Sequence, residues 1–142
     1  MSMDSTARTN LGPTNAEIAF VWLQRAVAVY CLLFGVLYWV RLLGFHEGAL
    51  WRFDLMPTYW QVASVCLAAF FPFAAIGLWM NASWGAVLWF ICAAAETGMY
   101  LFYPDLFGRR LPIVASHLVA FVAYAAIWLW LYRQRRHGER EE

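Results

Sequence analysis

The sequence contains no lysine and few charged residues of any kind. All ten basic residues other than histidine are arginines, and charged residues make up 13% of the 142-residue chain, compared with about 25% in an ordinary soluble domain. Without lysine, the chain has no candidate for a Schiff-base residue or a lysine phosphate clamp. Because the formal net charge is only +1, the composition does not favour nucleic acid as a partner.

Cysteines and motifs with recognisable chemistry are also scarce. Cys31, Cys66 and Cys92 all lie in apolar runs, and no two of them have the Cys-x-x-Cys spacing. This argues against a disulfide framework and against a cysteine-based metal site. The sequence contains no nucleophile motif, no phosphate-binding loop and no cluster of metal ligands. We therefore expect no catalytic residue, no metal and no cofactor.

Hydrophobic residues are abundant, at 63% of the chain, and they concentrate in four runs. About 20 apolar residues in a helix cross the hydrocarbon core of a bilayer, and these runs carry no polar face at helical spacing. Trp and Tyr gather at the ends of the runs, as in the aromatic belts of membrane proteins. The expected spans are 18–43, 59–80, 84–103 and 111–132. The pattern predicts an all-α, integral membrane, four-helix antiparallel bundle over residues 18–132.

The segments outside the four spans give an expected topology. We expect residues 1–17 to be disordered and residues 133–142 to form an arginine-rich tail; the first span has no cleavage signal and is expected to remain as an anchor. Four spans put both termini on one side, where six arginines lie against four on the other, which favours a cytoplasmic location for both termini. The six are Arg8, Arg25, Arg133, Arg135, Arg136 and Arg140, and the four are Arg41, Arg52, Arg109 and Arg110.

Two ionisable residues interrupt the apolar runs, Glu96 in the third and His117 in the fourth. At the helical rise they lie about 10 Å and about 9 Å below the same membrane boundary, so consecutive antiparallel helices carry them at one depth. A charge at the bilayer centre costs about 2.5–3.5 kcal/mol on insertion scales. Glu96 is therefore expected to be protonated, paired or hydrated, and a Glu–His pair that shares a proton is one solution.

The other two spans carry polar residues near the same boundary. Tyr38 and Arg41 end the first span there, and Gln61 and Ser64 begin the second. Tyr100 shares a helical face with Glu96, because it follows at i+4. The predicted intramembrane polar cluster consists of Glu96, His117, Arg41, Tyr38, Gln61, Ser64 and Tyr100.

Two motifs with small residues four positions apart predict close contacts between helices. They are Ala94-x-x-x-Gly98 in the third span and Ser116-x-x-x-Ala120 in the fourth. Small residues at this spacing let two helix backbones approach each other in a membrane. The two motifs therefore allow a close helix contact at each of these positions.

Four stretches carry a family resemblance, which covers the chain from about Val27 to Tyr132. They read FGVLYWVRLLGF, RFDLMPTYWQVA, FPFAAIGLWMNASWGAVLWF and PDLFGRRLPIVASHLV. In these stretches the sequence resembles a family of small four-span inner-membrane proteins of alphaproteobacteria that is described only as a domain of unknown function. The resemblance implies four helices, a location in the bacterial inner membrane and no established activity.

Two interpretations of function remain open from the sequence. The first is a non-enzymatic accessory or scaffold subunit, which packs in the lipid bilayer against a larger membrane protein or against itself. Its support is the near-absence of reactive groups. The alternative is a small carrier or redox-linked membrane protein, in which Glu96 and His117 handle protons or a quinone-type ligand in the outer half of the membrane. Replacing Glu96 with Gln distinguishes between these two interpretations of function.

Overall fold

The structure is a computed structural model that describes residues 12–138. Its helices are α1 (Asn15–Leu43), the 3-10 turn η1 (Phe53–Leu55), α2 (Thr58–Trp79), α3 (Ser83–Phe102), the short α4 (Pro104–Phe107) and α5 (Leu111–Gly138). The described residues contain no strand. Helices α1, α2, α3 and α5 are each long and apolar enough to cross a membrane. The predicted all-α bundle of four spans is confirmed.

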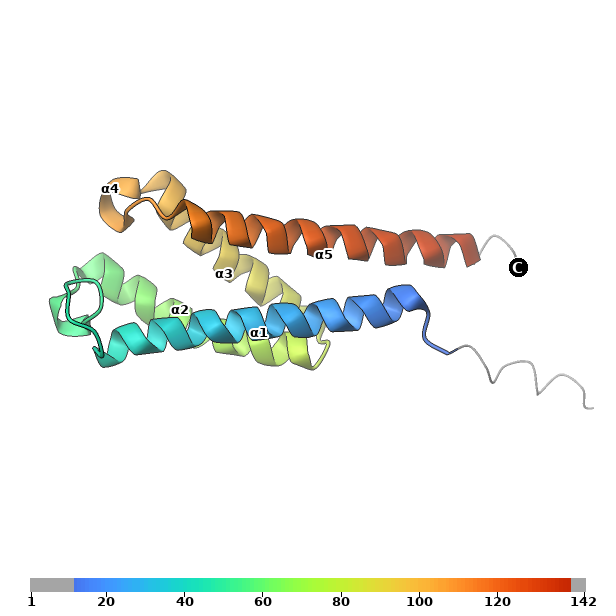
Figure 1. Cartoon of the computed structure of the whole chain (residues 1–142), viewed down its shortest axis with the longest axis horizontal. Helices are drawn as coiled ribbons and strands as arrows, with labels where there is room; N and C mark the ends of the chain where they lie inside the picture. The colour runs from blue at the N-terminus through green and yellow to red at the C-terminus, as the bar shows by residue number, and fades with distance from the viewer. Residues whose placement is uncertain (1–11, 139–142) are drawn as a thin grey trace, which may run out of the picture.

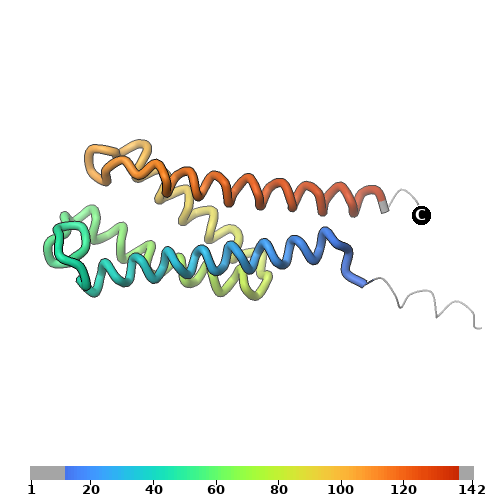
Figure 2. The backbone as a smooth tube through the Cα atoms, in the orientation of Figure 1, coloured from blue at the N-terminus to red at the C-terminus, as the bar shows by residue number. Residues whose placement is uncertain are grey.

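The four long helices run antiparallel in chain order (Figure 1). We call the end that carries η1 and α4 the loop end, and the end where α1 begins and α5 finishes the terminal end. Helix α2 packs against both α1 and α3, whereas α5 contacts α1 and α3 more sparsely. The tube view follows α5 from its meeting with α3 at the loop end to the terminal end, where the two helices diverge (Figure 2).

Two helices extend beyond the expected spans. Helix α1 begins at Asn15 because Thr14 and Glu17 form a reciprocal capping box, in which each side chain accepts a hydrogen bond from the backbone N–H of the other. Helix α5 continues through Gly138, so residues 133–138 of the arginine-rich tail are helical. The ends of these helices meet where Arg135 lies 3.6 Å from Glu17. Residues 1–11 of the segment expected to be disordered, and residues 139–142 of the tail, lie outside the described residues.

Close approaches between helices occur at glycines that the sequence motifs did not single out. A Cβ on Gly77 of α2 would lie 2.6 Å from the Cα of Gly85 in α3, and a Cβ on Gly35 would lie 2.8 Å from Cγ of Pro72. Gly98 makes no such contact, because its nearest neighbour would be a ring carbon of Phe102, on its own helix, at 3.7 Å. The predicted close seam at Ala94-x-x-x-Gly98 is therefore wrong.

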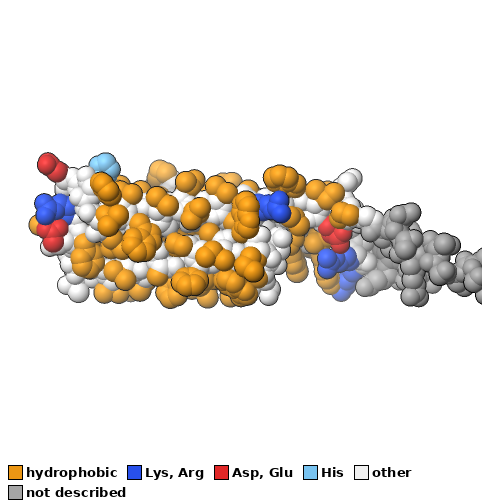
Figure 3. Space-filling model, turned by 90° about the horizontal axis from the view of Figure 1, so that it is seen from below, with side chains coloured by type: hydrophobic (Ala, Val, Ile, Leu, Met, Phe, Trp, Pro, Cys, Tyr) orange, Lys and Arg blue, Asp and Glu red, His pale blue; other side chains and the backbone are white. Residues whose placement is uncertain are grey.

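The core lies among α1, α2 and α3. Its largest buried apolar side chains include Phe71, Leu78 and Trp89. Helix α5 contributes little to it, because only His117 and Leu131 are buried between Leu111 and His137. On the outside, hydrophobic side chains cover most of the length of one face, and charged side chains gather mainly toward its two ends (Figure 3). This distribution suits a bundle surrounded by lipid.

Candidate functional site: a buried polar chain between three helices

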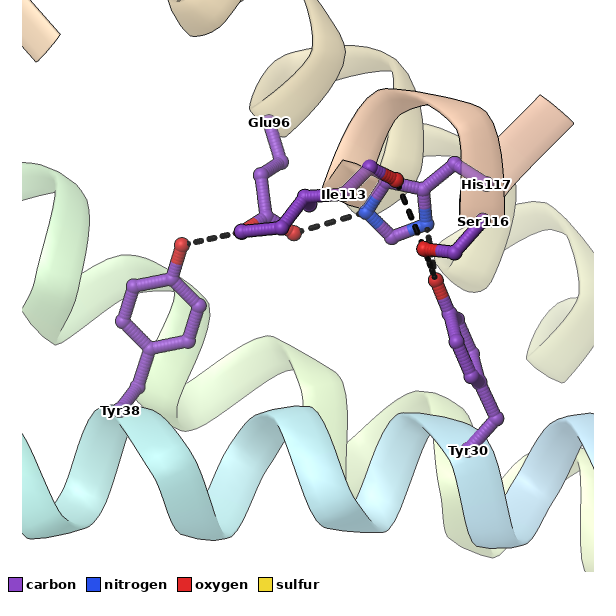
Figure 4. A network of polar contacts seen from close by, with 6 residues as sticks. All are labelled: Tyr30, Tyr38, Glu96, Ile113, Ser116 and His117. Atoms are coloured by element: carbon purple, nitrogen blue, oxygen red, sulfur yellow. Dashed lines mark hydrogen bonds and ion pairs between the residues drawn. The ribbon is translucent and has the colours of Figure 1, made fainter. Parts of the chain in front are cut away.

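Glu96 of α3 and His117 of α5 are in contact. The side-chain Nε2 of His117 lies 2.8 Å from Oε2 of Glu96, and the two residues are 3% and 1% exposed. They point toward each other across the junction of α3 and α5, on the side that faces α1 (Figure 4). The two ionisable residues that interrupt the apolar runs therefore form one buried pair.

Two tyrosines of α1 extend this pair in both directions. The hydroxyl of Tyr38 donates to Oε1 of Glu96 at 2.5 Å, and the hydroxyl of Tyr30 lies 3.0 Å from Nδ1 of His117. Tyr30 also lies 2.7 Å from Oγ of Ser116, which donates to the carbonyl of Ile113 at 2.7 Å. We call Tyr38, Glu96, His117, Tyr30 and Ser116 the polar chain. It starts at Tyr38 on α1, crosses α3 and α5, returns to α1 at Tyr30 and ends at Ser116 on α5 (Figure 4).

The carbonyl of Ile113 sets the direction of the hydrogen bonds. A carbonyl only accepts, so the single hydroxyl hydrogen of Ser116 points to it, and Tyr30 donates to Ser116. Tyr30 then accepts from Nδ1–H of His117. At the other ring nitrogen, one proton lies between Nε2 and Glu96. The pair is therefore either an imidazolium with a carboxylate or a neutral imidazole with a carboxylic acid.

Because Glu96 and His117 share this proton, the pair can be buried without a net charge. Both protonation patterns give Glu96 and His117 a combined charge of zero, and both oxygens of Glu96 and both nitrogens of His117 have a partner. An ionised carboxylate without a partner would have to lose its charge or draw in water at this position. The polar chain thus needs no further ligand to be satisfied.

Arg41, predicted as part of the cluster, lies beside the polar chain rather than in it. The residue is 1% exposed, and its guanidinium lies 5.2 Å, 5.0 Å and 5.4 Å from the ring centroids of Tyr38, Trp51 and Trp60. Within the described range its side chain forms no ion pair, and its buried Nε and Nη1 atoms have no hydrogen-bond partner. Tyr38 therefore stands between Arg41 and Glu96, with its ring toward the first and its hydroxyl toward the second.

The three other predicted cluster residues also lie near the loop end without joining the polar chain. Gln61 donates to the backbone carbonyl of Phe53 at 2.9 Å, and Oγ of Ser64 lies 3.9 Å from the sulfur of Met56. Tyr100 is buried on the same face of α3 as Glu96, but its hydroxyl has no partner. Of the seven predicted residues, the structure joins Tyr38, Glu96 and His117 by hydrogen bonds.

Sequence reasoning missed Tyr30 and Ser116 as members of the polar chain. Tyr30 lies about 16 Å along the helix from Arg41, at the rise of an α-helix, and this placed it deeper than the expected polar layer. A buried tyrosine hydroxyl usually finds a partner, so a tyrosine inside an apolar run was itself a signal. Ser116 was interpreted only as a small residue, although serine in a helix often bonds a carbonyl one turn back.

A cleft of about 430 Å³ lies between α3 and α5, with His117 in its wall. The other lining residues are small or apolar, and they include Ala94, Gly98, Leu101, Val114, Leu118 and Phe121. Gly98 and Ala94 thus widen the gap between the two helices instead of closing it. Because both nitrogens of His117 are engaged in the polar chain, the ring offers no free hydrogen-bonding atom to this cleft.

The fold and the polar chain define a small all-helical protein, with four helices suited to spanning a membrane and a buried Glu–His pair that ties three of them together. The chain belongs to the family of unknown function DUF6163, whose model matches residues 18–135. Searches of curated proteins and of solved structures found no match. The family thus covers all four long helices but supplies no activity.

Proposed function

We propose that this protein is a non-enzymatic accessory or scaffold subunit of a larger membrane assembly, and that the polar chain holds its helices together. The observation that supports this proposal is that every hydrogen-bonding atom of the Glu96–His117 pair already has a partner inside the bundle. A site that acts on a ligand usually presents a free polar group to it.

The packing of α5 supports the same proposal. Much of its apolar surface is exposed, and its two buried side chains are His117 and Leu131. Hydrogen bonds between membrane helices contribute about 0.6–2 kcal/mol each, so the polar chain is a substantial part of what attaches α5. A helix attached in this way offers a broad apolar face to lipid, to a larger membrane protein or to a second copy of the chain.

The proposal extends to location and topology. The protein resides in the inner membrane of an alphaproteobacterium, with both termini in the cytoplasm. The apolar character of all four long helices and the excess of arginine on the terminal side support this placement.

Replacing Glu96 with Gln tests the accessory role. The glutamine oxygen accepts from Tyr38, and its amide donates to Nε2 of His117, so the polar chain stays complete with the proton of His117 on Nδ1. We expect E96Q to accumulate normally, to retain a stoichiometric membrane partner in native-detergent pull-down with mass spectrometry, and to complement a deletion strain.

Glu96→Leu is the matched control for this experiment. It leaves the hydroxyl of Tyr38 and the Nε2 atom of His117 without a partner, at a cost of about 1–3 kcal/mol for each buried group. We expect a lower Tm and loss of the assembly in this variant alone. An E96Q protein that assembles fully but fails to complement contradicts the accessory role.

A second candidate is a small carrier or redox-linked membrane protein that handles protons or a quinone-type ligand. It is favoured by the proton shared between Glu96 and His117 and by the cleft of about 430 Å³ beside them. For a ligand to bond His117, either Glu96 or Tyr30 must first move away. If this candidate is correct, E96Q should assemble normally but lack activity. A small molecule should also copurify with the native protein.

A further inference from the structure

Arg41 is a buried positive charge without a counter-charge. Its Nε and Nη1 atoms are buried and make no hydrogen bond within residues 12–138. Arginine does not lose its proton in proteins, so burial cannot neutralise it. The carboxylate of Glu96, which accepts from the Tyr38 hydroxyl, is already balanced by the proton that it shares with His117. The ring faces of Tyr38, Trp51 and Trp60 attract the guanidinium but carry no net charge.

A second unpartnered group lies in the same place. Tyr100 is 3% exposed, and its buried hydroxyl has no hydrogen-bond partner. It belongs to the same buried cluster as Trp60, whose ring Arg41 overlies. Arg41 and Tyr100 together supply three of the six unpartnered buried side-chain atoms found in the described range.

These groups share one chemical character, because all three atoms are able to donate a hydrogen bond. Two belong to a guanidinium, which favours carboxylate, phosphate and other anions, and the third is a phenol hydroxyl. Hydrogen-bond donors and the positive charge of Arg41 therefore lie together around the ring of Trp60.

We propose that Arg41 and Tyr100 form a binding site for one small anion, such as a halide, a carboxylate or the phosphate of a lipid headgroup. The anion neutralises Arg41 and accepts hydrogen bonds from its guanidinium and from the Tyr100 hydroxyl. The aromatic rings around Arg41 hold the guanidinium in place and shield the ion from water. This site is separate from the polar chain and stands whether the protein is an accessory subunit or a carrier.

Thermal unfolding of the full chain in an uncharged detergent tests the site. Tm is measured by tryptophan fluorescence in sodium chloride, acetate or phosphate, against the bulky anion gluconate at the same ionic strength. A ligand that binds only the folded state raises Tm in a saturable way. We expect such a rise with at least one of the three small anions, and no rise in Arg41→Gln.

Tyr100→Phe is a second variant for the case in which Arg41→Gln fails to fold. It removes a single oxygen atom, so it tests the site with a smaller change to the fold. Loss of one hydrogen bond to a charged group should raise the half-saturating anion concentration by about tenfold or more. Arg25→Gln is the control, since Arg25 also lies over two tryptophan rings, at 5.7 Å and 5.5 Å, and also has an unpartnered Nε. It should keep the wild-type anion response.

The source of the anion is separated by adding lipid to the micelles. If a headgroup occupies the site, phosphatidylglycerol raises Tm at low salt and removes the response to free anions, whereas phosphatidylcholine does neither. If a free ion occupies it, the two lipids act alike. Identical Tm values in all salts and lipids, or an unchanged response in both Arg41→Gln and Tyr100→Phe, overturn the proposal.

Discussion

At the scale of single residues, Tyr30 and Tyr38 bond opposite ends of the buried Glu96–His117 pair, and they have different roles. Tyr38 donates to the carboxyl group of Glu96. Tyr30 accepts from Nδ1 of His117 and thereby directs the other ring nitrogen to Glu96. A partner that fixes one nitrogen of a histidine sets what the other can do. Tyr30 therefore controls the orientation of the ring as well as adding a bond.

Tyr30→Phe should weaken the bundle without emptying its core. The substitution removes the partner of His117 Nδ1, and Ser116 retains its bond to the Ile113 carbonyl. Because the buried Nδ1–H of His117 is left without a partner, we expect a loss of about 1–3 kcal/mol in the free energy of unfolding, measured as a lower Tm in detergent. Tyr103→Phe is the matched control, because Tyr103 is 59% exposed. An equal Tm in wild type and Y30F would show that the Tyr30 bonds contribute nothing.

The sequence identified only part of the polar chain, for physical reasons. Glu96 and His117 stand out because an ionisable group inside an apolar run is rare and costly. Tyr30 does not, because tyrosine is common in membrane helices and its position relative to a partner depends on how α1 is rotated. Gln61 is the opposite case, because it was predicted to join the polar cluster and does not. It lies at the depth expected for the cluster, but its side chain bonds the loop before α2 instead.

At the scale of helices, the α2–α3 hairpin depends on the absence of two side chains. Gly85 lies directly against the backbone of Gly77 and Leu78, and a Cβ there would collide with main-chain atoms. The tight connection is completed by Asn81 in the left-handed region, at φ 56°, and by a hydrogen bond from Ala82 N–H to the Gly77 carbonyl at 2.9 Å. Backbone atoms cannot move aside as the end of a flexible side chain can.

Gly85→Ala and Gly98→Ala should therefore have opposite effects, although both lie in α3. Overpacking costs about 1–3 kcal/mol, so we expect G85A to lower Tm. A Cβ on Gly98 meets only a ring carbon of Phe102 at 3.7 Å, so G98A should be neutral or gain up to about 1 kcal/mol from helix propensity. Tm values that fall equally in the two variants would contradict the close contact at Gly85.

The lengths of the helices were easier to predict than their contacts. An apolar run limits a span to within a few residues, as the agreement between residues 84–103 and α3 (Ser83–Phe102) illustrates. Small-residue motifs leave the facing helix unspecified, and the seam expected at Ala94 and Gly98 is instead the lining of the cleft beside α5. The extra turns of α1 and α5 come from a capping box and from a tail that continues the helix.

At the scale of the whole molecule, both ends of the described chain lie at the terminal end of the bundle (Figure 1). A reporter fused to either terminus should therefore give the same answer. We expect green fluorescent protein to fluoresce at both positions and alkaline phosphatase to be inactive at both, because arginine-rich flanks stay in the cytoplasm. Active phosphatase at both ends would reverse the proposed orientation.

The bundle as a whole was predictable because four apolar runs with short connections allow few other arrangements. The sparse attachment of α5 was not predictable. Its sequence is apolar on every side, so a face that contacts lipid and a face that contacts protein look alike. Only the position of His117 in the sequence indicated which face of α5 packs against the other helices.

The closed order of hydrogen bonds in the polar chain also has an evolutionary consequence. Each member is satisfied by its neighbours, so a change to an apolar residue at one position strands a donor or an acceptor at the next. Relatives should therefore keep the residues equivalent to Tyr30, Tyr38, Glu96 and His117 polar, or lose them, as a set, with intermediates rare. A lineage that has replaced the acid with an apolar residue should have an apolar residue in place of the histidine as well.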